Sequence, residues 1–218
     1  DVSGVWSGLR PLVKMDDTSA KAGLTADLSR RHRVFTSDNG VVTVTGGKLT
    51  TYREMAEDAV DEACELLNVK TKSRTRRLSL RGASGKRARS THADRHLDGR
   101  FGSDSSIVKQ LISQNPTLGE PLVPGLPYLR AEAVFAVTHE MATSIDDIMT
   151  RRTRSRLLDR KACVAATPAL ADLVGPLLSW TPEQRATNIA FFLDECARED
   201  AAAHVTEQEF IDSHKDTK

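Results

Sequence analysis

The stretch between residues 41 and 67 constrains the fold more than any other part of this 218-residue chain. It reads VVTVTGGKLTTYREMAEDAVDEACELL. The valines and threonines at its start predict a largely buried strand at residues 41–45, because β-branched side chains fit a pleated surface. Two glycines then permit a sharp turn. Apolar residues follow at helical spacing as far as Leu67, namely Met55, Ala59, Ala63, Leu66 and Leu67. The stretch therefore predicts a strand, a Gly-Gly turn and a long amphipathic helix.

The turn carries the features of an anion site. Lys48 follows the two glycines, Thr50 or Thr51 is expected to cap the helix, and Glu54 stands close to the third position of a capping box. The start of a helix leaves backbone N–H groups without partners and has a positive partial charge. Such a turn suits an anion. An ordinary connection with a solvated lysine would show the same pattern, so the turn alone does not identify a ligand.

A hairpin is expected to deliver this turn. The sequence SDNG at residues 37–40 separates two strand-like segments, residues 33–36 and 41–45. The pair Asn39-Gly40 is typical of a two-residue type I′ turn, in which both central residues have positive φ. The sequence therefore predicts an antiparallel hairpin whose second strand leads into the glycines.

Two residues before the hairpin are candidates for a site. Arg10 precedes Pro11, and a proline favours an extended conformation in the residue before it. The guanidinium of Arg10 would then project from a strand or its end, where its fork of donors suits a phosphate or carboxylate. His32 closes a basic cluster at residues 30–33. For His32 a structural or surface role is favoured over a role in the site.

Residues 70–100 differ sharply in composition from the rest of the chain. The net charge of the whole chain is only +1, yet this segment holds eleven basic residues against Asp94 and Asp98. It also contains three glycines and lacks a periodic apolar pattern. We interpret it as a basic linker between domains. Contact with a polyanion or an anionic lipid surface is a second interpretation. Binding of nucleic acid is not expected, because aromatic residues are not interleaved.

The second half of the chain is predicted to be helical. A short helix is expected at residues 105–114, then an extended connector at residues 115–128, which contains four prolines. Helical periodicity continues from residue 129. Thr167-Pro168 and Thr181-Pro182 both have the sequence of a helix start.

Some classes of site and location are not favoured by the residues. Cys64, Cys163 and Cys196 are odd in number and widely spaced, which predicts reduced thiols in a cytosolic protein rather than a disulfide or a zinc site. No run of residues is long and apolar enough to predict a membrane span. His139 and Glu140 are adjacent, so on a helix they would point about 100° apart, and His139 is expected to be structural. No metal site is predicted.

The strings GGKLTTYREMAEDAVD and VWSGLRPLV together resemble the FAD-dependent glycerol-3-phosphate dehydrogenases. The resemblance covers nearly the whole chain. It implies an enzyme that oxidises sn-glycerol 3-phosphate to dihydroxyacetone phosphate, with hydride passing to FAD and electrons then passing to a membrane quinone. It also implies an α+β fragment: residues 1–69 as the end of an FAD-binding α/β domain, residues 70–100 as the linker, and residues 101–218 as an all-α C-terminal domain.

The resemblance also implies roles for particular residues. Arg10 would bind the substrate phosphate, and Lys48 would lie over the flavin and the substrate. The turn would contact the cofactor through Gly46, Gly47, Lys48, Leu49 and Thr50. The RRTR segment at residues 151–154 would bridge the helical and flavin domains.

The sequence lacks a GxGxxG motif after a strand, so most of the FAD site and the catalytic base are expected upstream of Asp1. The chain alone is therefore expected to be inactive. We expect a cytoplasmic homo-oligomer, peripheral on the inner face of the plasma membrane. Two alternatives remain: a glycerol-3-phosphate oxidase that uses oxygen, and a non-catalytic helical module for dimerisation or docking.

Overall fold

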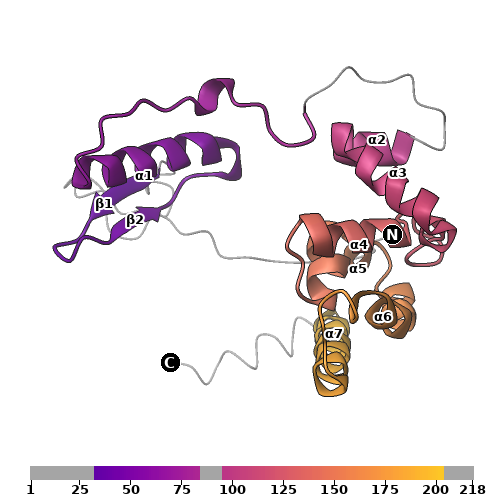
Figure 1. Cartoon of the computed structure of the whole chain (residues 1–218). Coiled ribbons are helices and arrows are strands. Elements are labelled where there is room, and N and C mark those ends of the chain that lie inside the picture. Colours follow the sequence, from indigo (N-terminus) through magenta and orange to yellow (C-terminus); the bar gives the residue numbers. More distant parts are fainter. Residues whose placement is uncertain (1–31, 84–94, 204–218) are drawn as a thin grey trace, which may run out of the picture. The chain divides into compact units, whose positions relative to one another are not determined.

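The computed structural model describes residues 32–83 and 95–203 of the chain (Figure 1). These residues belong to two units, divided between Leu80 and Arg81. The first unit contains the strands, the Gly-Gly turn and one long helix. The second is entirely helical in its described part. Each unit is considered by itself below.

The first unit begins with the expected hairpin. Strand β1 (Arg33–Thr36) pairs antiparallel with β2 (Val42–Thr45). The predicted type I′ turn is wrong, because Gly40 has a φ of +81° while Asn39 is not left-handed. The Gly40 N–H donates to the Ser37 carbonyl at 2.8 Å, and the Ser37 N–H donates to the Val41 carbonyl at 3.1 Å. This is a three-residue loop that ends in a left-handed glycine, the next commonest hairpin connection.

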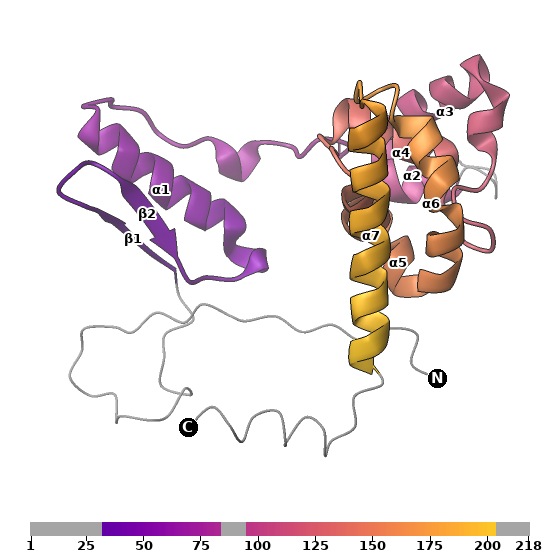
Figure 2. The same ribbon diagram turned by 90° about the horizontal axis from the view of Figure 1, so that it is seen from below.

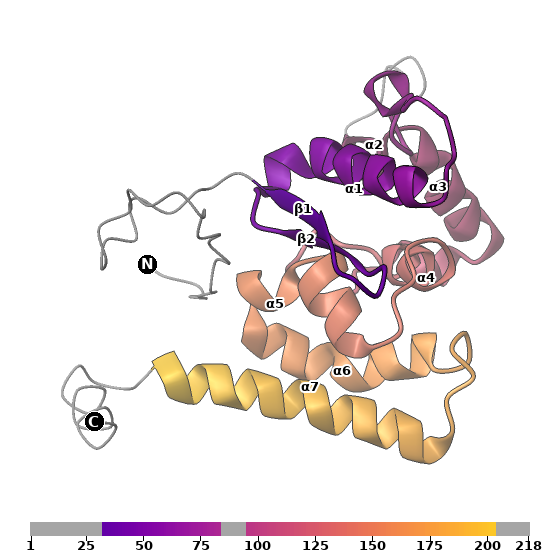
Figure 3. The same cartoon turned by 90° about the vertical axis from the view of Figure 1, so that its left-hand side faces the viewer.

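Helix α1 (Tyr52–Leu66) lies across one face of the hairpin (Figure 3). The Thr36 hydroxyl joins the two by donating to Glu62 at 2.6 Å. The strand was expected to be largely buried, but no described residue of this unit is fully buried. Phe35 remains 42% exposed and Leu67 74% exposed. One helix can cover only one face of two short strands, so the unit leaves apolar surface uncovered.

Six α-helices form the described part of the second unit. They are α2 (Arg95–Phe101), α3 (Ser105–Gln114), α4 (Arg130–His139), α5 (Ser155–Leu158), α6 (Arg160–Val174) and α7 (Pro182–Ala203). The helix predicted at residues 105–114 is confirmed. Helix α2 begins within residues 70–100, the segment expected to be linker. It folds there because Leu97, only 4% exposed, packs into the core.

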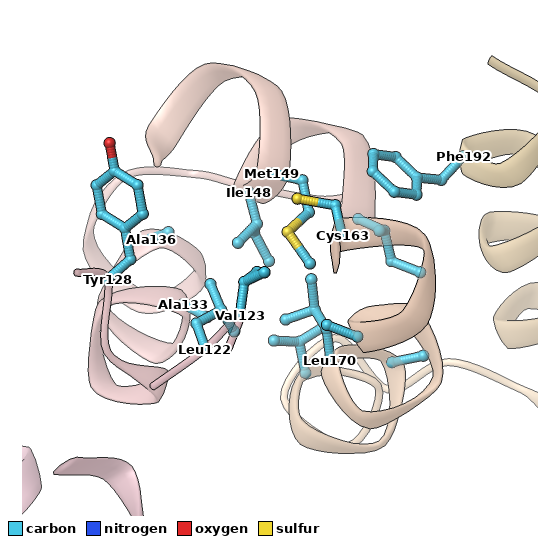
Figure 4. Close-up of a cluster of buried hydrophobic side chains, with 14 of the residues drawn as sticks. Leu122, Val123, Tyr128, Ala133, Ala136, Ile148, Met149, Cys163, Leu170 and Phe192 are labelled. Carbon is cyan, nitrogen blue, oxygen red and sulfur yellow. The ribbon is translucent and has the colours of Figure 1, made fainter. Parts of the chain in front are cut away.

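Two clusters of buried side chains hold the helical unit together. The larger one includes Ile148, Met149 and Phe192 (Figure 4). The smaller one joins α2, α3 and α4. The expected extended connector at residues 115–128 is wrong, because it contains the 3-10 turn Pro116–Gly119 and buries Leu122 and Val123 in the larger cluster. The four prolines disfavour a continuous helix here, but they do not prevent packing.

The two predicted helix starts had different outcomes. At Thr181 the capping box is confirmed: its hydroxyl accepts from the Gln184 N–H at 3.2 Å, and its own N–H donates to the Gln184 side chain at 2.9 Å. Thr167-Pro168 does not start a helix, since Pro168 lies inside α6. That helix begins instead after Asp159, which accepts from the Ala162 N–H at 2.9 Å. Helix α7 then lies along α6 (Figure 2).

Charged side chains join α5 and α6 to α7. The Arg156 guanidinium binds Glu199, and Arg160 binds Glu199 at 3.3 Å and Asp200 at 2.6 Å. The hydrogen bond from Arg156 lowers the pKa of Glu199 below its ordinary value, and Arg160 adds to the effect. Arg156 also contacts Asp146 at 2.8 Å. This network ties the last helix of the described chain to the preceding ones.

The three cysteines are free thiols. Cys163 on α6 and Cys196 on α7 are buried, whereas Cys64 on α1 is partly exposed. Burial raises the pKa of the Cys163 thiol to about 12, and burial also raises the pKa of Cys196. Both buried thiols are therefore protonated near neutral pH.

Candidate functional site

The turn after β2 requires glycine at two consecutive positions. Gly46 has a φ of +77° and Gly47 a φ of +80°, which is the left-handed region that other residues enter only with strain. Gly47 has a second constraint: a Cβ atom there would lie 2.5 Å from the Met55 sulfur. The backbone of the turn thus rests directly on a side chain of α1.

The helix opens with the 3-10 turn Leu49–Thr51, and Lys48 is its N-cap. The Thr51 hydroxyl accepts from the Lys48 N–H at 3.2 Å and donates to the Lys48 carbonyl at 3.0 Å. Thr51 therefore closes the turn onto Lys48. The expected capping box with Glu54 does not form, because the hydroxyl and the N–H of Thr51, the N-cap of α1, both bond to Lys48 instead.

Several hydrogen-bond donors gather at this turn. Within residues 32–83 and 95–203, the N–H groups of Leu49 and Thr50 have no hydrogen-bond partner, and neither does the ammonium of Lys48. Lys48, Leu49 and Thr50 are all exposed. The structure thus brings together the predicted residues Gly46, Gly47, Lys48, Leu49 and Thr50. A cation beside two free N–H donors at a helix start suits an anion or a group that develops negative charge.

Side chains on α1 also bind neighbouring segments of the first unit. His32 Nε2 lies 2.6 Å from Asp58 Oδ2. Arg53 binds Glu57, and its guanidinium also donates to the Thr75 hydroxyl at 3.1 Å. The hydrogen bond from Arg53 lowers the pKa of Glu57 below its ordinary value. The spacing of Arg53 and Glu57, four residues apart, was a usable signal for this pair.

Some predicted residues are placed elsewhere or lie outside the described residues. Arg10 belongs to residues 1–31, which the structure does not describe. His139 is on the helical unit, where its Nδ1 lies 2.7 Å from the Thr138 hydroxyl and its ring stacks on Phe135 at 4.6 Å. Thr138 and Phe135 are thus its contacts, as a structural role would require.

The RRTR segment closes a π-helix, Asp147–Arg152. Arg151 binds Asp147 at 3.0 Å, and Arg152 donates to the Glu140 carbonyl at 2.6 Å. Arg154 is exposed and left-handed, with a φ of +60°. Arg151 and Arg152 therefore make their contacts within the helical unit. The expected bridge to a flavin domain stays a prediction.

Neither a metal site nor a membrane span is found among the described residues. No group of three or more His, Cys, Asp or Glu side chains in this part of the chain could hold a metal ion. None of the helices described is both long and apolar enough to cross a bilayer.

The fold is shared with a solved flavoprotein. The glycerol-3-phosphate dehydrogenase from Bacillus halodurans complexed with FAD has a TM-score of 0.60 to this chain, with 24% sequence identity. The match covers 77% of this chain and 36% of that one. A strand–turn–helix unit followed by an all-helical unit is thus the fold of one portion of a flavin-dependent dehydrogenase.

Sequence comparison assigns the chain to a protein family. Residues 73–185, more than half of the chain, match the model described as the C-terminal domain of alpha-glycerophosphate oxidase. The chain belongs to this family of glycerol-3-phosphate oxidases and dehydrogenases. The family that the GGKLTTYR and GLRP segments indicated is confirmed.

Similar proteins include two from Mycobacterium tuberculosis (strain ATCC 25618 / H37Rv). Glycerol-3-phosphate dehydrogenase 1 is 42% identical over 173 residues, and glycerol-3-phosphate dehydrogenase 2 is 36% identical over 197 residues. These matches cover 76% and 83% of this chain, but only 33% and 32% of the relatives. The mitochondrial glycerol-3-phosphate dehydrogenase of Rattus norvegicus is 34% identical over 197 residues, which are 83% of this chain and 26% of that protein. The chain spans about a third or less of the length of these relatives.

Proposed function

We propose that this chain is the C-terminal part of an FAD-dependent glycerol-3-phosphate dehydrogenase. The reaction is the oxidation of sn-glycerol 3-phosphate to dihydroxyacetone phosphate. The observation that carries the proposal is the GGK turn (residues 46–48) in a chain of this family: there Lys48 lies beside the N–H groups of Leu49 and Thr50, which have no partner among the described residues. Because the chain spans about a third of its relatives, the remaining FAD contacts and the catalytic base would come from other parts of the enzyme.

The turn fits a redox cofactor that gains negative charge. Bound FAD would accept the hydride that leaves C2 of the substrate. The donors at Leu49 and Thr50 and the ammonium of Lys48 would stabilise the charge that develops beside them. Because Gly46 and Gly47 fix the turn before the reaction, little reorganisation is needed. Gly47 also lets the backbone approach closely, since it carries no Cβ.

Arg10 would hold the substrate. A guanidinium can bind a phosphate through two parallel hydrogen bonds, which fixes orientation as well as affinity. This role fits glycerol 3-phosphate, whose phosphate is remote from the reacting carbon. Replacing Arg10 with Ala should therefore raise the KM for glycerol 3-phosphate, and an unchanged KM would contradict the role.

We propose a membrane quinone as the electron acceptor of the complete enzyme. The basic residues of the 70–100 segment support a peripheral position on the anionic inner face of the plasma membrane, since each Lys or Arg near such a surface contributes about 1 kcal/mol. Oxygen is the alternative acceptor. Stopped-flow reoxidation of the reduced enzyme by a soluble quinone and by oxygen distinguishes the two. We also propose a homo-oligomer, which the mass of the purified enzyme in solution tests.

The first experiment is anaerobic addition of glycerol 3-phosphate to the purified full-length protein that carries this chain. Loss of the absorbance at about 450 nm, where oxidised flavins absorb, is the expected result. A coloured protein that does not bleach would retain the flavin and reject the substrate. A colourless protein would favour the helical docking module.

The second experiment tests Lys48. We expect Lys48→Met to slow flavin reduction by about a hundredfold or more, which is typical for loss of one stabilising group. Lys70→Met is the control, because Lys70 is also an exposed lysine of this unit but lies after α1 rather than at the turn. Equal reduction rates in the two variants would remove Lys48 from the site.

A further inference from the structure

Two side chains, those of Met55 and His32, lie beside Gly47 of the GGK turn. A Cβ atom on Gly47 would lie 2.5 Å from the sulfur of Met55, 2.9 Å from its methyl carbon and 3.2 Å from Cβ of His32. The Met55 thioether would therefore have to move to admit an added atom at Gly47. The backbone at Gly47 is thus packed closely against the Met55 side chain and lies near His32.

His32 is in turn held by α1. Its Nε2 lies 2.6 Å from Asp58 Oδ2, and only 17% of the His32 side chain is exposed. Asp58 follows Met55 by three residues, so both side chains project from the same face of the helix. Helix α1 thus contacts the turn twice, directly through Met55 and indirectly through Asp58 and His32.

Within the described part of this unit, the strands also pack against α1 and the Thr36 hydroxyl donates to Glu62, but Thr36 pairs with Val42 at the far end of β2 from the turn. The unit has no fully buried residue that could hold it by core packing. The Thr51 hydroxyl closes the turn onto Lys48, but Thr51 belongs to the same 3-10 turn and moves with it. Met55 and the His32–Asp58 pair are therefore the side-chain contacts that join α1 to the turn at Gly47.

We propose that Met55, His32 and Asp58 are positioning residues for Lys48 and for the N–H groups of Leu49 and Thr50. The inference rests on the proposed function of the turn. Donors stabilise a developing charge only if they are already in place, and a displacement of about 1 Å can cost about a hundredfold in rate. Met suits this position because its flexible thioether fills irregular space against a backbone. The imidazole suits it because a carboxylate can fix its orientation.

The test uses the full-length enzyme with Asp58→Ala, and with Asp61→Ala as the matched control. Asp61 is an exposed aspartate on the same helix with no hydrogen-bond partner among the described residues. The first measurement is hydrogen–deuterium exchange of the peptide that covers residues 46–50, without substrate. Exchange should be about tenfold faster or more in Asp58→Ala than in Asp61→Ala.

The second measurement is steady-state kinetics. Asp58→Ala should lower kcat by about tenfold or more with a smaller change in KM, and Asp58→Asn should restore part of the loss because it keeps an acceptor for His32. Met55→Ala should behave like Asp58→Ala, with Met55→Leu as the rescue. Should Met55→Ala fail to fold, the Asp58 series carries the test, since the Asp58 side chain is 54% exposed.

Equal exchange and equal kcat in Asp58→Ala and Asp61→Ala would overturn the inference. Failure of the proposed function gives a different result, in which Lys48→Met itself leaves flavin reduction unchanged. A damaging Lys48→Met combined with a neutral Asp58→Ala would overturn the positioning role alone.

Discussion

Phe191 and Phe192 are neighbours on α7 and have opposite environments. Phe192 is fully buried in the larger core cluster, whereas Phe191 is 53% exposed. Burial of an aromatic ring removes a large apolar area from water, so the energetic weight of the two rings should differ greatly.

Replacing Phe192 with Ala should lower the free energy of unfolding by about 3 to 5 kcal/mol, through lost burial and the cavity left behind. Phe191→Ala should change it by less than about 1 kcal/mol, as is usual for exposed positions. Urea unfolding of the chain, followed by circular dichroism, measures both. Similar losses in the two variants would mean that the helix faces are assigned wrongly.

Helix α7 illustrates how a local signal sets a boundary. Thr181 and Gln184 satisfy each other's backbone N–H groups at its start. Thr187, one turn further on, donates its hydroxyl to the Glu183 carbonyl inside the helix at 2.9 Å. A threonine therefore caps the helix at position 181, whereas at position 187 its hydroxyl only bonds to a carbonyl that already belongs to the helix.

Thr181→Ala should destabilise the protein by about 1 kcal/mol, which is typical of a lost N-cap. Thr187→Ala should be neutral or slightly stabilising, because Ala has the higher helix propensity. Thermal unfolding midpoints compare the two. A larger loss in Thr187→Ala would contradict the assigned start of α7.

The contact between α7 and the helices before it should depend on pH. Because Arg156 lowers the pKa of Glu199 from its ordinary value of 4.5 in the folded state, this carboxylate contributes stability that is present above about pH 4.5. The contribution is lost as the pH falls through the lowered pKa. Unfolding free energies measured between pH 7 and pH 3 should thus fall less steeply in Glu199→Gln than in the unchanged chain. Parallel curves would exclude Glu199 as a contributor.

Elements could be predicted where neighbouring residues determine them. The helix at residues 105–114, the capping box at Thr181 and the hairpin partners follow from spacing within a few residues. The start of α6 does not follow from local spacing, because Thr167-Pro168 has the local pattern of a helix start and packing overrides it. The π-helix was likewise not predicted from its local sequence. At Thr167, the hydroxyl bonds back to the Cys163 carbonyl at 2.8 Å instead of capping.

At the scale of the whole molecule, the two units differ in how much core they contain. All fully buried hydrophobic side chains of the described chain belong to the helical unit. The first unit consists of a two-stranded hairpin and one helix, and such a hairpin is marginally stable alone. Completion of the first unit would therefore require further strands or a partner surface.

A polypeptide of residues 81–203 should unfold cooperatively on heating, because it retains both core clusters. A polypeptide of residues 32–80 should show no cooperative transition. Circular dichroism melts of the two test this directly. A cooperative transition in the shorter polypeptide would show that the hairpin and α1 suffice for a stable fold.

The candidate site was predictable in part for the same reason. Lys48 and the glycines lie within one short string, so their proximity followed from the sequence. The contact of Gly47 with Met55 and His32 depends on how α1 crosses the hairpin, which no local pattern specifies. Sequence therefore identified the turn but not its support.

The difference in exposure among the three thiols allows a fluorescent label to be attached near this turn. Cys163 and Cys196 are buried and protonated, which makes them poor nucleophiles. A maleimide fluorophore should consequently attach to Cys64, which lies on the same helix as Met55 and Asp58. Of the three thiols of this chain, Cys64 is thus the one open to labelling, and the emission of a label there would report movement of helix α1.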